Sequence, residues 1–207
     1  MRRFFVEQQL KDGGVTLAGG EHHHLCNVLR TRVGDDIILV CGDTFDYHYK
    51  VTAITKNNST LSFIKKEKNK RNPDVNITAY MGAIKPDALA QAVTALNEIG
   101  VSDLYIFKSD FSQKTANIEK LNSIAKQSCK QCERSIPLRV HGIIDFTDIP
   151  NDAKIVIGPE GGFSENEKSR IKQMGADIYL GKRILRSETA IVAACVLAMT
   201  EAEKWSL

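Results

Sequence analysis

Residues 154–167 read Lys154-Ile-Val-Ile-Gly-Pro-Glu-Gly-Gly-Phe-Ser-Glu-Asn-Glu167, a short apolar run followed by a glycine-rich turn. The run is β-branched and too short for a helix, so it predicts a buried strand. Proline and glycine end a strand and favour a turn. Ser164 and Glu167 then form a capping-box pattern that begins a helix, and Gly175 suits the left-handed residue that ends one. The sequence therefore predicts a strand, a glycine turn and a helix in succession.

A second glycine turn follows closely. Residues 178–191 read Ile178-Tyr-Leu-Gly-Lys-Arg-Ile-Leu-Arg-Ser-Glu-Thr-Ala-Ile191, and the apolar run 190–199 predicts a core helix. The first turn does not match a phosphate cradle, because no Lys-Ser/Thr pair directly follows it and the Glu160 carboxylate would repel a phosphate. The Gly-x-Gly-x-x-Gly spacing of dinucleotide sites is also missing. Two interpretations remain open: a pair of ordinary βα turns, or one ligand slot at the carboxyl ends of parallel strands.

The two turns resemble the motifs of one family. Ile157-Gly-Pro-Glu-Gly-Gly-Phe-Ser-x-x-Glu167 and Leu180-Gly-x-Arg-Ile-Leu-Arg-Ser-Glu-Thr-Ala190 are similar to those of the RsmE family of 16S ribosomal RNA uridine-N3 methyltransferases, in the SPOUT superfamily. The resemblance implies an α/β fold: a C-terminal SPOUT α/β-knot methyltransferase domain at 73–207 and a small N-terminal PUA-like RNA-binding β-barrel at 1–72. The trefoil knot, threaded by the segment around 180–190, comes from the resemblance alone, because knotted chains are rare.

The composition is that of a globular protein. The 207 residues are 43% hydrophobic and 26% charged, and a chain of this length can bury a sizeable core. No apolar run reaches the roughly 18 residues of a membrane span, and the first seven residues lack a signal-peptide core. Five irregularly spaced cysteines predict reduced thiols rather than a disulfide framework. We therefore expect a cytoplasmic protein with no membrane segment.

The first 72 residues differ from the rest in charge and in pattern. They hold 12 Lys and Arg against 8 Asp and Glu, whereas the remainder holds 16 against 17. This excess favours a nucleic-acid partner for the first segment. Strand-like segments at 4–6, 35–40, 45–54 and 60–65, with one helix at 22–30, predict a small β-barrel. The polar run 65–71 is expected to be a linker.

From residue 75 onward, strands alternate with helices. Strands are expected at 75–81 and 104–107, and helices at 86–98 and 118–133. This order predicts a mostly parallel sheet covered by helices. Two positions depart from the family pattern: a usual lysine is Ala95, and a segment that usually carries Arg-Ser reads Asp110-Phe111-Ser112. Both fall on the RNA side of the predicted domain.

The resemblance implies S-adenosylmethionine as the cofactor. This methyl donor carries no phosphate, which agrees with a carboxylate in the first turn. Ile184 and Leu185 are expected to form apolar walls for the adenosine. The predicted cofactor-binding residues are Met81, Gly82, Gly158, Glu160, Gly161, Gly162, Leu180, Gly181, Ile184, Leu185, Arg186, Thr189 and Ala190.

Arg186 is the candidate catalytic residue. Uridine N3 lies on the Watson–Crick edge, so the base must be unpaired or extruded before it can be methylated. Arg186 would stabilise the negative charge that develops on O2 and O4. An ion pair with Glu188 or Glu160 is an equally supported role. The sequence does not name a general base.

The expected partners are 16S ribosomal RNA in the small subunit and a second copy of the chain, both implied by the resemblance. Gln131 and Arg134 match the family's Gln-x-x-Arg…Pro signature and are candidates for a substrate site shared by the dimer. The predicted RNA-binding residues are Arg2, Arg3, His24, Arg30, Arg32, Gln131 and Arg134.

No metal is expected. Adjacent side chains on a helix point about 100° apart, so His22, His23 and His24 cannot converge on one ion. Cys129 and Cys132 have a zinc-like spacing but lack two further ligands, and ordinary packing accounts for them. Two alternatives to uridine-N3 methylation stay open: a SPOUT methyltransferase with another target nucleotide, and a catalytically silent RNA-binding dimer.

Overall fold

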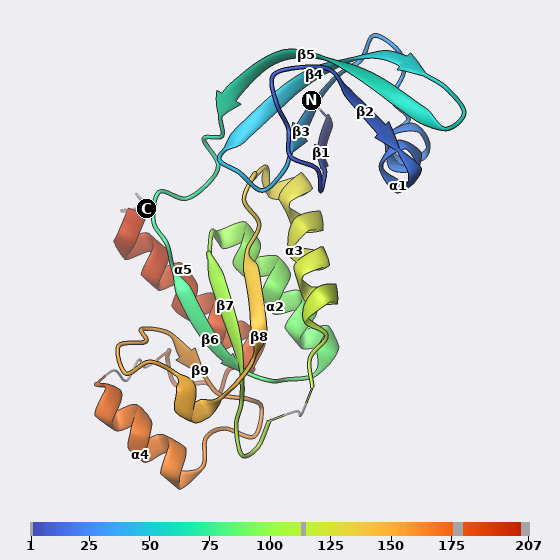
Figure 1. Ribbon diagram of the computed structural model, residues 1–207. Helices are drawn as coiled ribbons and strands as arrows, with labels where there is room; N and C mark the ends of the chain where they lie inside the picture. The colour runs from blue at the N-terminus through green and yellow to red at the C-terminus, as the bar shows by residue number, and fades with distance from the viewer. Residues whose placement is uncertain (1, 113–114, 176–179, 204–207) are drawn as a thin grey trace. The chain divides into compact units, whose positions relative to one another are not determined.

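The computed structural model describes residues 2–112, 115–175 and 180–203 (Figure 1). Contacts between residues divide the chain into two compact units. The first consists of residues 1–72 and 129–136, and the second of residues 73–128 and 137–207. The first unit therefore includes a short segment that is distant from it in sequence.

A five-stranded mixed sheet forms the first unit. Its strands run in the order β1-β3-β4-β5-β2, with β1 and β3 parallel and the other neighbours antiparallel. The strands are β1 (Arg2–Phe5), β2 (Val15–Ala18), β3 (Asp36–Val40), β4 (Phe45–Ile54) and β5 (Asn58–Lys68). β4 has the predicted bounds, whereas β2 was not recognised in the sequence. The predicted N-terminal β unit is confirmed.

A short helical segment joins β2 to β3. It consists of α1 (Gly19–His23) and a single π-helical stretch, η1 (His24–Val28). Leu25 points into the core of the sheet and is fully buried, as are Leu17, Ile37 and Leu61. The helix begins earlier than predicted, because Gly19 and Gly20 are helical rather than part of a turn.

The expected linker at 65–71 is wrong for most of its length. Residues 65–68 continue β5, and all four of their side chains are exposed. Asn69 is buried, and its side-chain amide donates to Asp46 Oδ1 at 2.7 Å and to the Glu133 carbonyl at 2.9 Å. The charged run is thus the solvent-exposed end of a strand, and the asparagine that follows it is fixed within the unit.

A parallel four-stranded sheet forms the second unit, in the order β8-β7-β6-β9 (Figure 1). The strands are β6 (Thr78–Gly82), β7 (Asp103–Lys108), β8 (Arg139–Asp145) and β9 (Val156–Ile157). The predicted parallel sheet is confirmed. β8 was not recognised in the sequence, and β9 is shorter than the predicted strand because only Val156 and Ile157 pair with β6.

Helices cover both faces of this sheet. They are α2 (Pro86–Ile99), α3 (Ile118–Cys132), α4 (Glu165–Met174) and α5 (Ser187–Glu203), with a 3₁₀ turn, η2 (Phe146–Asp148). Residues of α2, α3 and α5 form one apolar core with Met81, Leu104 and Val140. α4 packs on the opposite face, where Tyr80 and Phe107 are buried. Alternate strand residues thus supply the two faces.

Local signals explain where the helices begin and end. α2 begins with Pro86 at its first position and ends at Gly100, whose φ of 115° is left-handed. α4 has the predicted capping box and ends at Gly175, with φ 83°. Part of the second predicted strand, Ile178 and Tyr179, lies outside the described residues. The knot depends on the course of this segment and stays a prediction.

The helices and the cysteines bear on the membrane and thiol predictions. In residues 2–112, 115–175 and 180–203, none of the helices has both the length and the apolar character that a bilayer crossing demands. All five cysteines are free thiols, and Cys129 and Cys195 are buried.

Candidate active site

The first glycine turn follows β9 at the carboxyl edge of the parallel sheet. The Gly162 nitrogen donates to the Pro159 carbonyl at 2.9 Å, which closes the turn. Gly162 adopts a φ of 73°, a left-handed conformation that a residue with a side chain rarely takes. The predicted strand, turn and capped helix are therefore confirmed in this order.

The glycines of this turn allow neighbouring segments of the protein to approach closely. A Cβ added to Gly82, at the end of β6, would lie 2.6 Å from the Pro159 Cδ atom. A Cβ added to Gly161 would lie 2.7 Å from the Phe111 Cβ atom. The turn is thus packed between the end of β6 and the segment after β7. Only glycine, which has no Cβ, allows this close packing at Gly82 and Gly161.

Glu167 ties these segments together. It is almost fully buried, and its carboxylate accepts the Ser164 nitrogen at 2.8 Å, which completes the capping box. The same carboxylate accepts the Ser109 hydroxyl and the Asp110 nitrogen, both at 3.1 Å. Sequence reasoning found the capping role and missed the second one, because residues 109 and 110 are distant in the chain.

Glu160 lies over the start of α2. Its side chain is exposed, and its Oε1 atom accepts the Lys85 nitrogen at 3.4 Å. Lys85 directly precedes α2, so the carboxylate stands at the carboxyl end of β6. A negative charge near the positive end of the α2 dipole is favourable.

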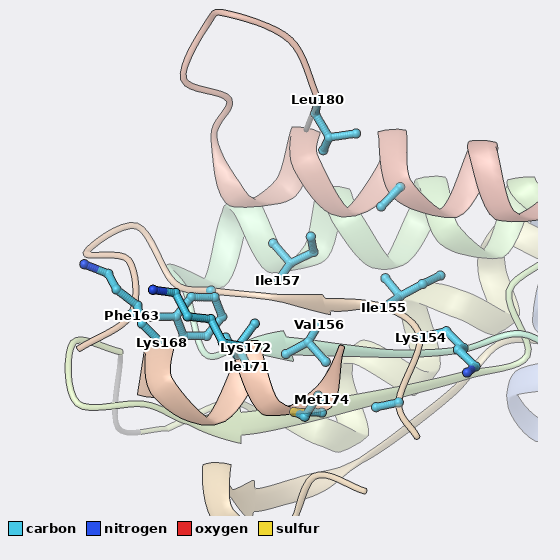
Figure 2. Close-up of a pocket in the computed structure, with 13 residues that line it drawn as sticks. Lys154, Ile155, Val156, Ile157, Phe163, Lys168, Ile171, Lys172, Met174 and Leu180 are labelled. Carbon is cyan, nitrogen blue, oxygen red and sulfur yellow. The ribbon is translucent and has the colours of Figure 1, made fainter. Parts of the chain in front are cut away.

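A cavity of about 440 Å³ lies beside β9. Gly158 from the first glycine turn and Leu180 from the second both line it, so the two turns border one space in the described part of the chain. Figure 2 shows Ile157 pointing toward α5 and Val156 toward Met174 of α4. The walls are mainly apolar, with Lys154, Lys168 and Lys172 as cationic members.

The second turn exposes most of its side chains. Gly181 is left-handed, with φ 98°. Ile184 is fully exposed and Leu185 is half-buried, so Ile184 does not form an apolar wall in this conformation. Its predicted contact with adenosine stays a prediction.

Arg186 stands directly before α5. Its side chain is 86% exposed, and its guanidinium lies 3.9 Å from Glu188 Oε1. Its carbonyl accepts the Ala190 nitrogen at 2.8 Å, the first bond of the helix. The ion pair with Glu188 is long and solvated, and such pairs contribute little. The guanidinium is therefore only weakly held.

The remaining predicted cofactor residues surround the same edge of the sheet. Met81 is fully buried in the helix-covered core, so only its backbone can face a ligand. Gly82 is buried against Pro159. Thr189 is exposed and Ala190 is half-buried, both in the first turn of α5.

The predicted RNA-binding arginines of the first unit fall into two groups. Arg3 forms two hydrogen bonds with the Asp46 carboxylate, at 2.6 and 2.8 Å, and only 8% of its side chain is exposed. Arg2 pairs with Asp35 at the surface, and Arg30 and Arg32 are exposed. Arg3 is thus engaged inside the unit, whereas the other three can reach a phosphate.

The other predicted RNA-binding residues also belong to the first unit. His24 Nε2 lies 3.2 Å from the Lys130 ammonium, and burial together with this charge lowers the pKa of His24. Gln131 is exposed. Arg134 is only 3% exposed, so its guanidinium lies inside the unit. Within the described residues, no group of three His, Cys, Asp or Glu side chains could hold a metal.

These features define a two-unit α/β protein with a ligand cavity between two glycine turns, the arrangement of a small-molecule-dependent enzyme. A family model described as an RNA methyltransferase domain matches residues 70–154 and 150–199. A second model, described as an RNA methyltransferase PUA domain, matches residues 17–64. The chain therefore belongs to the RNA methyltransferase family.

Individual relatives agree with this assignment. The chain is 26% identical to "Ribosomal RNA small subunit methyltransferase E" of Helicobacter pylori strain J99, covering 95% of this chain and 99% of that protein. The Bacillus subtilis protein of the same name is also 26% identical, covering 92% and 93%. The resemblance to the RsmE family is confirmed.

Solved structures show the same fold. A ribosomal RNA small subunit methyltransferase E from Neisseria gonorrhoeae, bound to S-adenosyl methionine, matches with a TM-score of 0.85 at 25% identity over 98% of both chains. A methyltransferase from Legionella pneumophila with bound cofactor matches with a TM-score of 0.83 at 19% identity over 97% of both chains, a likeness of fold.

Proposed function

We propose that this protein methylates N3 of a specific uridine in the 16S ribosomal RNA of the small subunit, with S-adenosylmethionine as the methyl donor. The proposal is supported by relatives that match nearly the whole chain and carry the small-subunit methyltransferase name. The observation that carries it is the shared cavity, to which one glycine turn contributes Gly158 and the other Leu180.

The chemistry of the cavity suits this cofactor. The mainly apolar walls fit an adenosine. Glu160 does not line the cavity, but it stands in the adjoining glycine turn, where its carboxylate would repel a phosphate and tolerates a sulfonium or a hydroxyl. When bound, S-adenosylmethionine supplies an electrophilic methyl group. We propose that it is held by Met81, Gly82, Gly158, Glu160, Gly161, Gly162, Leu180, Gly181, Ile184, Leu185, Arg186, Thr189 and Ala190.

Arg186 is the proposed catalytic residue. Loss of the N3 proton places negative charge on O2 and O4 of the uridine, and this charge is consumed when N3 takes the methyl group. The weakly held guanidinium of Arg186 can turn toward these oxygens, because its contact with Glu188 is long and exposed. The positive end of the α5 dipole adds to the same potential.

The two parts of the chain take different roles in this proposal. Residues 1–72 bind RNA, and residues 73–207 carry the methyltransferase site. Arg2, Arg30 and Arg32 are the proposed phosphate contacts, since their side chains are exposed. A homodimer, in which the exposed Gln131 contributes to a shared substrate site, completes the proposal. We expect the protein to act in the cytoplasm, where ribosomes are assembled.

The test uses small subunits from a strain that lacks the gene. They are incubated with the purified protein and methyl-labelled S-adenosylmethionine, and the RNA is digested to nucleosides for mass spectrometry. Labelled N3-methyluridine supports the proposal. Label on another nucleoside indicates a different target, and RNA binding without any label indicates a silent RNA-binding protein.

A further inference from the structure

Phe111 is an exposed aromatic side chain on the segment that follows β7. It is 57% exposed and is the one aromatic residue among the large hydrophobic side chains that the described residues leave exposed. Removing an apolar ring from water is favourable by about 25 cal/mol for each Å². A phenylalanine held in solvent beside a functional site therefore suggests that something else covers the ring.

The segment that carries Phe111 is firmly held. Glu167 accepts the Ser109 hydroxyl and the Asp110 nitrogen. Ser112 Oγ accepts the Ser109 nitrogen at 2.9 Å and donates to the Ser109 carbonyl at 3.0 Å, and the Ser112 nitrogen donates to the same carbonyl. The exposure of the ring thus belongs to a turn fixed on both sides of Phe111.

Phe111 lies directly against the first glycine turn. Its Cβ and carbonyl oxygen are the atoms that a Cβ on Gly161 would meet, at 2.7 and 3.2 Å. The cavity beside β9 is lined by Gly158 and Phe163 from the same turn, but Phe111 does not line it. The ring therefore stands beside the turn, outside the space assigned to the methyl donor.

We propose that the Phe111 ring stacks on an unpaired base of the substrate RNA at the entrance of the methyl-donor site. The inference rests on the proposed function and adds a residue that positions the RNA. Unpaired bases are commonly held by aromatic side chains, and a fixed ring loses little conformational entropy when it stacks. The location fits, because the reacting base must reach the same glycine turn.

The experiment compares Phe111→Ala, Phe111→Leu and Phe111→Trp with the unchanged protein. Stacking on one base corresponds to a loss of about 5- to 150-fold on alanine substitution. We expect the KM for small subunits, and the dissociation constant of the RNA in a filter-binding assay, to rise by about tenfold in the Ala and Leu variants. The Trp variant should retain wild-type values, and the affinity for S-adenosylmethionine by calorimetry should change less than about twofold in all of them.

Several results would overturn the inference. Full RNA affinity in Phe111→Leu would show that an apolar contact suffices, and weaker binding of S-adenosylmethionine in Phe111→Ala would make the ring part of the cofactor site. A change of oligomeric state in the Ala variant would mean that a second copy covers it. If the unchanged protein transferred no methyl group, the proposed function would fail. The stacking role of Phe111 would still be tested by RNA binding, because equal RNA affinity of Phe111→Ala and the unchanged protein would reject it.

Discussion

Glu167 Oε1 accepts a hydrogen bond from the Asp110 backbone nitrogen across 3.1 Å, which joins the start of α4 to the segment after β7. The same carboxylate caps its own helix through Ser164. One buried side chain thereby fixes both the glycine turn and the turn that packs on it. The conformation of the proposed methyl-donor site depends on this residue.

Replacing Glu167 by alanine should destabilise the protein. The change leaves the Ser164 nitrogen, the Asp110 nitrogen and the Ser109 hydroxyl, all in part-buried hydrogen bonds, without their acceptor. An unsatisfied donor costs about 1–3 kcal/mol when buried and less where water reaches it. We expect the free energy of unfolding to fall by at least about 2 kcal/mol in urea titrations. Glu165→Gln is the control, because the Glu165 side chain is exposed and bonds Lys168 at the surface. If Glu167→Ala lowered the free energy of unfolding no more than Glu165→Gln does, Glu167 would not hold the two segments together.

Arg186 can be separated from its ion pair by kinetics. Arg186→Ala should lower kcat at saturating RNA by about 100-fold, since a preorganised charge of this kind contributes roughly 3 kcal/mol. Glu188→Ala should keep most of the activity, because it leaves the guanidinium in place. Lys182→Ala, an exposed cation of the same turn, serves as the control for a general charge effect. Equal losses in the Arg186 and Glu188 variants would assign Arg186 to the ion pair alone.

Patterns within one segment were readable from the sequence. The Ser164–Glu167 capping box, the Pro86 start and Gly100 end of α2, and the alternation of strands and helices all depend on neighbours in the chain. These signals were sufficient to predict the parallel sheet and the position of the first glycine turn.

Features that depend on distant neighbours were not readable. β8 contains Gly142 at an irregularity in its pairing with β7, so it shows no clean alternation. The lysine-rich end of β5 looks like a linker until Asn69 is seen bonded to Asp46. Arg3 looks like a phosphate ligand because sequence does not reveal its buried partner. Tertiary contacts decide each of these cases.

His24 should make stability depend on pH. Burial, and then the charges of Lys130 and His23, lower the pKa of His24 below its usual value of 6.5. The folded state therefore binds this proton less readily than the unfolded state, so stability is lost as the pH falls below about 6.5 toward the folded pKa. We expect His24→Asn to show a smaller decrease in the free energy of unfolding between pH 7 and pH 5 than the unchanged protein.

Urea titrations at several pH values measure the slope of the free energy of unfolding against pH. Lys130→Met removes the nearby positive charge and should also reduce the slope, although burial still contributes. His23→Asn should reduce it least, because the charge of His23 is the smallest of the three causes. An unchanged slope in His24→Asn would show that other groups set the pH dependence.

Replacing Arg3 by alanine should lower stability, whereas replacing Arg2 by alanine should weaken RNA binding. Arg3 and Asp46 form a buried pair, and Asn69 also donates to that carboxylate, so Arg3→Ala leaves a buried negative charge with one partner fewer. Breaking such a pair typically costs about 3–5 kcal/mol, whereas an exposed pair such as Arg2 with Asp35 contributes about 0–1 kcal/mol. Urea unfolding should therefore detect only the Arg3 change.

RNA binding should weaken in Arg2→Ala, and it should show a smaller salt dependence because one phosphate contact is lost. A folded, fully stable Arg3→Ala variant with weakened RNA binding would reverse the two roles and make Arg3 a phosphate ligand.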